Sequence, residues 1–394
     1  MPRLHRGHLP RAAFAGAALV ASLVVVGMGP ATAETLGGEQ LAQPTVTVSL
    51  GPEGAPVPRV RAATWILADA ETGEVLAQKA SHVPRSPAST LKMLTALAVL
   101  PRTSPETRYV ATPRAAFTYG SRVGLKPGKS YTMDQLWYAV FLPSANDAAI
   151  AVAQANGGVR KTVRQMNDVA FELRALDTVA KNTNGLDAPG QRSSAYDLAL
   201  IARAGLARPD FARYASTVKA QFPDVKGRGS HAIYTTNRLL LSGWRGAIGV
   251  KTGFTSQAGR TYVGAATRGG RTLIVALMGI REPSEDAARK LLKWGFANAD
   301  DVEPVGTLVE PGSPLPAPDD TSAGGVSATG GPGGTEGQGA DPTSGGAATA
   351  AATQEPAPVA ASVVVGALAL AAAAGVATLA SRRLRARPVG RHAA

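Results

Sequence analysis

The sequence contains no cysteine and only five histidines. Without cysteine there are no disulfide bonds, so the fold must rest on its hydrophobic core. Three histidines lie near the chain ends, which leaves His82 and His231, far apart in the sequence. The usual ligand sets of a zinc peptidase are therefore absent, and neither histidine lies in a recognisable Ser-His-Asp motif. We expect an activity that needs no metal and no cofactor.

Acidic residues are also few: 28 Asp and Glu against 41 Lys and Arg give a net charge of +13. Three arginines lie in residues 1–33 and five in residues 381–394, with no acid in either segment, which leaves +5 for residues 34–380. The excess charge therefore belongs mainly to the chain ends. It is poor evidence for a nucleic-acid partner, and we expect none.

Residues 1–33 have the pattern of a secretory signal peptide. A basic start is followed by an apolar run over 12–28 and by Ala31-Thr32-Ala33, which predicts cleavage after Ala33. The alternative is an uncleaved anchor, but the run is shorter than the roughly 20 residues that span a bilayer. This pattern predicts export.

The other end has the pattern of a membrane anchor. Residues 359–380 carry no charge and are long enough to form a transmembrane helix, and the arginines of residues 381–394 predict a basic cytoplasmic tail. The alternative is a buried Ala-rich helix. Residues 301–358 are rich in Gly, Ala and Pro and predict a flexible tether. We expect a protein held at the extracytoplasmic face of the cell membrane.

The globular part is expected at residues 57–300, after a mobile lead-in at 34–56. Strand-like segments occur at both ends of this part and helical patterns between them, which predicts an α/β fold. Its mainly antiparallel sheet is expected to have helices on both faces and an inserted helical lobe. The expected strands are 64–68, 75–78, 247–252, 261–267 and 272–278, and the expected helices are 89–100, 133–142, 148–155, 167–176, 195–207 and 284–297.

Ser89-Thr90-Leu91-Lys92 opens an apolar helical segment. Residues three apart share a helix face, so the Lys92 amine should lie near the Ser89 hydroxyl. Burial and a second cation would lower the pKa of Lys92 and make it a base. The pattern alone is weak, because Ser216 and Lys219 repeat it. That copy has no helix after it, and we interpret it as incidental.

Two further motifs follow in order. Ser144-Ala145-Asn146 comes after Pro143, between two helical runs, where Ser144 can relay a proton and Asn146 can bond Lys92. The alternative is that Asn146 merely caps the next helix. Lys251-Thr252-Gly253 ends a strand-like run, where the lysine and hydroxyls can receive a carboxylate and glycine lets a substrate approach. Together the motifs contain the parts for acyl-serine chemistry.

The segments 87–97, 142–149 and 249–255 resemble the corresponding motifs of serine D-alanyl-D-alanine carboxypeptidases, the low-molecular-mass penicillin-binding proteins of the peptidase S11 type. Segments 184–187 and 237–240 add to the resemblance, which covers about residues 64–296. Leu91 stands where the family often has threonine, and the C-terminal β domain of some members is absent. The resemblance implies a penicillin-binding, β-lactamase-like transpeptidase fold.

It also implies that Ser89 is the acylated nucleophile, with Lys92 as its base and Ser144 and Asn146 lining the cleft. Lys251, Thr252 and Thr255 would bind the substrate carboxylate beside Gly253, and the N–H groups of Ser89 and Phe254 would form the oxyanion hole. Peptidoglycan stem pentapeptides are then the substrate, and β-lactam antibiotics are covalent inhibitors. The alternatives are a serine β-lactamase, although Glu172 does not begin the expected Glu-x-x-Leu-Asn pattern, and an inactive wall-binding module. Hydrolysis and transpeptidation are not distinguished.

Overall fold

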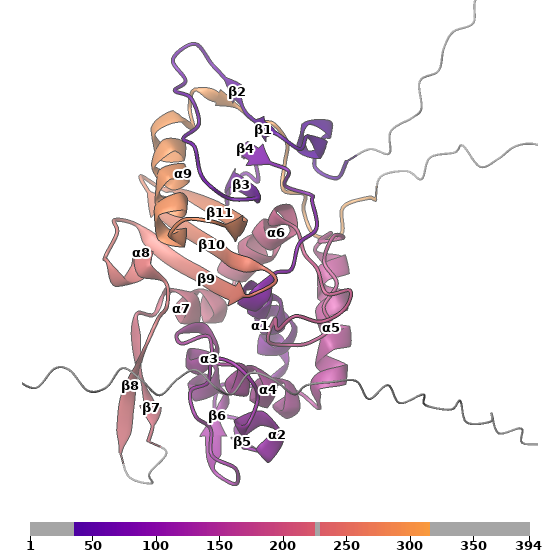
Figure 1. The fold of residues 1–394 in the computed structure, drawn as a ribbon, viewed down its shortest axis with the longest axis vertical. Helices are drawn as coiled ribbons and strands as arrows, with labels where there is room; N and C mark the ends of the chain where they lie inside the picture. The colour runs from indigo at the N-terminus through magenta and orange to yellow at the C-terminus, as the bar shows by residue number, and fades with distance from the viewer. Residues whose placement is uncertain (1–34, 225–228, 316–394) are drawn as a thin grey trace, which may run out of the picture. The chain divides into compact units, whose positions relative to one another are not determined.

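A computed structural model describes residues 35–224 and 229–315 (Figure 1). The expected signal peptide, the transmembrane helix at 359–380 and the basic tail lie outside these residues, as does most of the expected tether. Within the described ranges, no helix is both long enough and apolar enough to cross a membrane.

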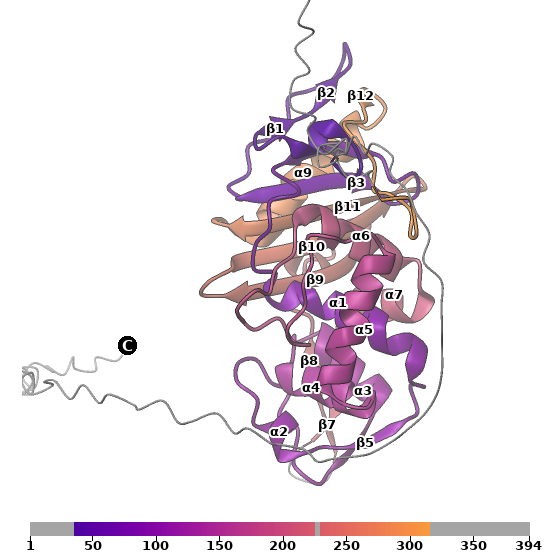
Figure 2. The same cartoon turned by 90° about the vertical axis from the view of Figure 1, so that its right-hand side faces the viewer.

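A six-stranded antiparallel sheet organises the described part of the chain, in the order β1-β4-β3-β11-β10-β9. The meander expected in the last third of the sequence is present, and β9 forms one edge of the sheet, beside α1 (Lys92–Val99) (Figure 2). The strands are β1 (Val46–Thr47), β3 (Thr64–Asp69), β4 (Val75–Lys79), β9 (Ala247–Thr255), β10 (Gly259–Arg268) and β11 (Arg271–Ile280).

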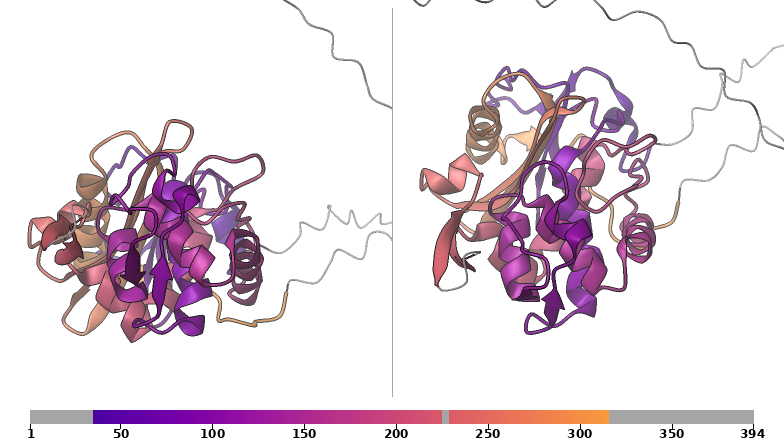
Figure 3. Two further views of the ribbon diagram at one scale, coloured as in Figure 1. Left: turned by 90° about the horizontal axis from the view of Figure 1, so that it is seen from below. Right: turned by 60° about the horizontal axis from the view of Figure 1, so that its bottom comes forward.

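Helices cover both faces of this sheet, as the sequence predicts (Figure 3). The side chains of a strand alternate between the two faces, and in β3 both sets are buried. Trp65 and Leu67 pack in a core with α9 (Ser284–Asn298), whereas Ile66 and Ala68 join the core that contains α1 and α6 (Ala195–Leu206). The sequences of the central strands are therefore nearly continuous runs of apolar residues.

The helical lobe lies between β4 and β9 in the chain. Its helix α3 begins with a capping box in which Thr132 and Gln135 each bond the other's backbone. Two short strand pairs flank these helices, β5 (Arg108–Val110) with β6 (Ser130–Thr132) and β7 (Lys219–Pro223) with β8 (Ser230–Tyr234). The helices are α1 (Lys92–Val99), α2 (Pro113–Ala116), α3 (Met133–Phe141), α4 (Asn146–Ala155), α5 (Val159–Glu172), α6 (Ala195–Leu206) and α7 (Pro209–Ser216), followed by α8 (Arg238–Leu241) before β9.

The two ends of the globular part differ from expectation. Residues 35–56 are packed against the domain: β1 pairs with β4, and β2 (Ser49–Leu50) pairs with β12 (Val302–Glu303). Residues 302–308, which fall within the expected tether, are also packed against the domain. Burial of Leu41, Val305 and Leu308 explains both differences, since these apolar side chains anchor otherwise polar segments in the core.

Candidate active site

Ser89 lies in a tight turn that leads directly into the first helix. Residues Ala88–Leu91 form a 3-10 turn, and α1 continues from Lys92. The turn begins with Ala88 in the left-handed region at φ 49°, which residues other than glycine rarely adopt. Residues three apart nearly eclipse in such a turn, and Lys92 Nζ lies 2.8 Å from Ser89 Oγ. The predicted contact between the Ser89 and Lys92 side chains is therefore present.

The Lys92 amine has two further partners, and both are carbonyl oxygens. Its nitrogen lies 2.7 Å from Asn146 Oδ1 and 2.9 Å from the backbone oxygen of Asn184. The Asn146 amide is oriented by its other end, where Nδ2 donates to the Tyr119 carbonyl. A neutral amine has two N–H donors and one lone pair. The two carbonyls take the donors, which leaves the lone pair for the Ser89 hydroxyl proton.

Electrostatics favour that neutral form. Lys92 is completely buried, and burial holds the pKa of its amine well below the ordinary value. The positive charge of Lys251 lowers this pKa further, whereas the buried carboxylate of Asp147 opposes the shift. These effects favour the uncharged amine, which is the form that can accept the Ser89 proton.

Ser144 occupies the break between α3 and α4 and meets the second lysine. It has a left-handed backbone, φ 60°, and its Oγ accepts a hydrogen bond of 2.9 Å from Lys251 Nζ. That amine also donates to the Thr252 carbonyl at 2.9 Å. Burial lowers the pKa of Lys251 to about 7. The helix-capping alternative for Asn146 does not hold, because Ala145 occupies the cap position of α4.

Strand β9 contains the third motif and lies beside Ser89. It extends to Thr255, so residues 251–255 lie within the strand and not after it. A Cβ atom at Gly253 would lie 2.8 Å from the Ser89 nitrogen and 2.4 Å from Thr261 Oγ1. Only glycine permits this approach. The Thr252 and Thr236 hydroxyls lie 2.7 Å apart.

A cleft of about 340 Å³ connects these elements. The motif residues that line it are Ser89, Ser144, Thr252, Gly253 and Phe254. The other three are buried beside it: Lys92 bonds Ser89, Lys251 bonds Ser144, and Asn146 bonds Lys92. Its remaining lining residues include Ser121, Thr236, Arg238, Arg260, Tyr262 and Glu285.

The sequence matches a family of known proteins. The profile of the peptidase S11 family, described as D-alanyl-D-alanine carboxypeptidase, matches residues 52–282. The chain belongs to the D-alanyl-D-alanine carboxypeptidase family. The family assignment makes it a serine peptidase.

Relatives in several bacteria support the assignment. The chain is 41% identical over 249 residues to D-alanyl-D-alanine carboxypeptidase DacB2 of Mycobacterium tuberculosis, covering 61% of this chain and 84% of that protein. Identity to DacA of Escherichia coli is 36% over 265 residues, or 63% and 64% of the two chains.

Solved structures of similar proteins support the same family. A crystal structure of a D-alanyl-D-alanine carboxypeptidase from M. tuberculosis has a TM-score of 0.62 and 40% identity, and the match covers 66% of this chain and 99% of that chain. The DD-transpeptidase of Streptomyces K15 has a TM-score of 0.59 and 29% identity, covering 62% and 100%. The predicted family and fold are confirmed.

Several contacts in this site are not evident from the sequence. Asn184 acts through a backbone carbonyl, which no residue type reveals. Asp147 accepts hydrogen bonds from the backbone nitrogens of Val123, Gly124 and Leu125, at 3.1, 2.8 and 3.0 Å, and so fixes the loop beside the cleft. Arg238 lies within segment 237–240, which adds to the family resemblance, so this segment could have identified Arg238 as a site residue.

Thr255 and the second Ser-x-x-Lys copy are not part of the cleft lining. The Thr255 hydroxyl donates to Asp187 Oδ1 at 2.8 Å instead of facing the cleft. Ser216 lies at the exposed end of α7, where its hydroxyl bonds the Ala212 carbonyl, and the exposed Lys219 lies over the Tyr234 ring. The interpretation of this copy as incidental agrees with that geometry.

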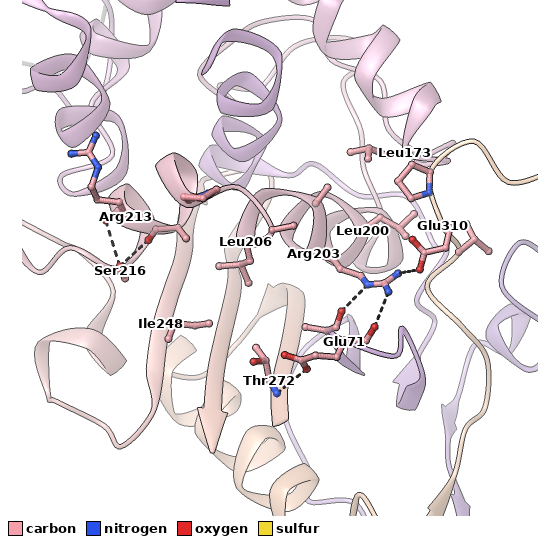
Figure 4. A pocket seen from close by; sticks show the side chains of 17 residues that line it. Glu71, Leu173, Leu200, Arg203, Leu206, Arg213, Ser216, Ile248, Thr272 and Glu310 are labelled. Atoms are coloured by element: carbon pink, nitrogen blue, oxygen red, sulfur yellow. Dashed lines mark hydrogen bonds and ion pairs between the residues drawn. The ribbon is translucent and has the colours of Figure 1, made fainter. Parts of the chain in front are cut away.

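A larger cavity of about 690 Å³ lies elsewhere, between α6, α7 and the start of β9 (Figure 4). Its walls are mostly apolar, and Arg203 at its rim is paired with Glu310 at 2.8 Å and donates to the Glu71 carbonyl. No member of the three motifs lines it. Among the described residues, no group of three or more acidic or histidine side chains could hold a metal ion.

Proposed function

We propose that this chain is a serine D-alanyl-D-alanine carboxypeptidase that removes the terminal D-alanine from peptidoglycan stem pentapeptides. The observation that carries the proposal is the pairing of the buried Lys92 amine with Ser89 Oγ, at 2.8 Å, while its other two partners are hydrogen-bond acceptors. Family membership supplies the substrate class and the reactivity toward β-lactams.

Acylation follows from these positions. Ser89 Oγ attacks the carbonyl carbon of the penultimate D-alanine while its proton passes to Lys92 Nζ. The N–H groups of Ser89 and Phe254 stabilise the oxyanion, because Gly253 brings β9 close to the Ser89 nitrogen. The bond to the terminal D-alanine nitrogen then breaks. The proton held by Lys92 returns to that nitrogen through the Ser144 hydroxyl.

The terminal carboxylate is held by cations and hydroxyls on β9 and around it. Lys251 bonds Ser144 and lies next to Thr252, which lines the cleft. Arg238 and Arg260 line the same cleft and add positive charge. A bound carboxylate would raise the pKa of Lys251 and keep that amine protonated.

Water then attacks the acyl-serine and releases the shortened peptide. Transpeptidation uses the same intermediate with an amine in place of water, and a solved relative is described as a DD-transpeptidase. Glu172 does not line the cleft, and its sequence lacks the Glu-x-x-Leu-Asn pattern of β-lactamase-type deacylation, although Glu285 does line the cleft. The missing pattern favours the carboxypeptidase over a β-lactamase.

The direct test is D-alanine release from a pentapeptide by the wild type and by Ser89→Ala. We expect release by the wild type and none by the variant, with both proteins folded. A peptide product of higher mass in the presence of an amine acceptor would assign transpeptidation. Release by Ser89→Ala equal to that of the wild type would refute the proposed chemistry.

We further propose that the enzyme works at the extracytoplasmic face of the cell membrane. The support is the sequence alone: the signal-peptide pattern of residues 1–33 and the uncharged run at 359–380 followed by arginines. A chain ending at residue 358 should be recovered in the soluble fraction, and the full chain should require detergent. Equal detergent dependence of both chains would contradict the anchor.

A further inference from the structure

Thr255 and Asp187 form a contact that the sequence does not predict. Asp187 belongs to the loop between α5 and α6, and its Oδ1 accepts from two hydroxyls: Thr255 Oγ1 at 2.8 Å and Ser86 Oγ at 2.9 Å. Thr255 ends β9, and Ser86 lies three residues before the nucleophile. One carboxylate oxygen thus joins three segments that surround Ser89.

The Thr255 hydroxyl has no proton left for a substrate. A hydroxyl donates one hydrogen bond, and this one goes to Asp187. Its oxygen also accepts from the Ala258 nitrogen at 3.0 Å. A substrate carboxylate needs a donor, so Thr255 is unsuited to bind it. Thr252 differs, because it lines the cleft and its hydroxyl pairs with the adjustable hydroxyl of Thr236.

The loop that carries Asp187 also touches the nucleophile turn. The Asn184 carbonyl accepts from Lys92, and a Cβ atom at Gly185 would lie only 1.9 Å from the Ala88 carbonyl oxygen. Asn182 and Gln191 hold the loop by donating to the Leu186 carbonyl, each at 2.7 Å. Asp187 therefore extends from a well-braced loop to the end of β9.

We propose that Asp187 and Thr255 are positioning residues that clamp the end of β9 beside Ser89, and that Thr255 does not bind the substrate carboxylate. This inference rests on the proposed function. The clamp holds the strand on the far side of Phe254, while the close contact of Gly253 with the Ser89 nitrogen holds it on the near side. It thereby fixes the Phe254 N–H group of the oxyanion hole. Loss of the clamp lowers the rate of acylation, since small displacements in such a site cost up to about a hundredfold.

The experiment compares Asp187→Ala, Thr255→Val and the double variant in the full chain. Each single variant should acylate with penicillin about tenfold to a hundredfold more slowly, and the double variant no more slowly than either single one. Asp187→Asn and Thr255→Ser keep the acceptor and the donor, so both should recover most of the rate. Asp210→Ala, which removes a carboxylate bonded to Arg208 at the start of α7, is the matched control and should match the wild type.

A second readout separates positioning from carboxylate binding. D-alanine release is compared with release of D-alaninamide from the corresponding amide peptide. Thr255→Val should lower kcat for both and leave their ratio of kcat/KM unchanged, whereas Thr252→Val should reduce the preference for the carboxylate. A loss of that preference in Thr255→Val, additive effects of the two single variants, or wild-type rates in both would overturn the clamp. An inactive wild type would overturn the proposed function and this inference with it.

Discussion

Lys92 Nζ lies 2.8 Å from Ser89 Oγ at the start of α1, and its two other partners are carbonyl oxygens. This environment suits an uncharged amine. Burial and the neighbouring Lys251 both lower the pKa of Lys92, so the hydrogen bonding and the electrostatics agree. The arrangement supplies the base that histidine provides in other serine hydrolases.

Replacement of this amine should abolish acylation without unfolding the protein. Lys92→Met keeps an unbranched chain of similar length in the buried site but removes the base, so we expect penicillin acylation to fall by about 10² to 10⁴. Lys219→Met, in the incidental copy of the motif, is the control and should acylate at the wild-type rate. A Lys92→Met variant within threefold of the wild type would rule out Lys92 as the base.

A negative charge beside Lys92 should shift the pH dependence of acylation. In Asn146→Asp, a carboxylate replaces the amide whose Oδ1 lies 2.7 Å from the amine, and it raises the pKa of Lys92. A larger fraction of the base is then protonated at a given pH. We expect slow acylation at pH 7 that recovers as the pH rises, measured as the acylation rate from pH 5 to 10. Equal loss at every pH would show that the carboxylate acts in another way.

The activity of the wild type should fall as the pH rises above about 7. Burial lowers the pKa of Lys251 to about 7, so its amine loses the charge that attracts the substrate carboxylate above that pH. The profile of kcat/KM, which reports the free enzyme, should therefore descend from near neutrality. Lys251→Arg keeps its charge and should move the descent to higher pH. A descent at the same pH in both proteins would assign it to another group.

Asp147 should contribute more to stability than any exposed acid. It is fully buried and accepts from four backbone nitrogens, those of Val123, Gly124 and Leu125 and, at 2.9 Å, that of Ala148. Asp147→Ala leaves these donors without their partner, and the free energy of unfolding should fall by about 3 kcal/mol or more. Urea unfolding measures this. Asp168→Ala, on the exposed side of α5, should change it by less than about 0.5 kcal/mol, and equal losses would contradict the assignment.

Local features of the site were predictable, because they depend on near neighbours in the sequence. The contact between Ser89 and Lys92 needs only one helical turn. The strands from Ala247 to Ile280 follow from apolar β-branched runs separated by glycine turns. In both cases the residue types and their spacing carry the information.

Contacts between distant segments were not predictable. The bonds from Lys92 to the Asn184 carbonyl and from Thr255 to Asp187 join residues 92 and 68 positions apart. The first uses a backbone atom, and the second joins Asp187, which lies in the resemblance segment 184–187, to a partner that this segment does not indicate. The packing of residues 35–50 was also missed, since its strands have two residues each and depend on the burial of Leu41.

The start of α5 was difficult to predict because most of its side chains are polar and lie at the surface. It begins at Val159, eight residues before the expected start, and it buries only Thr162, Met166 and Ala170. Its first half is rich in Arg and Lys, so the apolar face is too narrow to stand out.

The most direct test of the central claim is the mass of the intact protein after exposure to penicillin, with the modified peptide identified after digestion. We expect one adduct on the peptide that contains Ser89, and none in Ser89→Ala. An adduct on any other residue, or equal modification of the variant, would contradict Ser89 as the nucleophile.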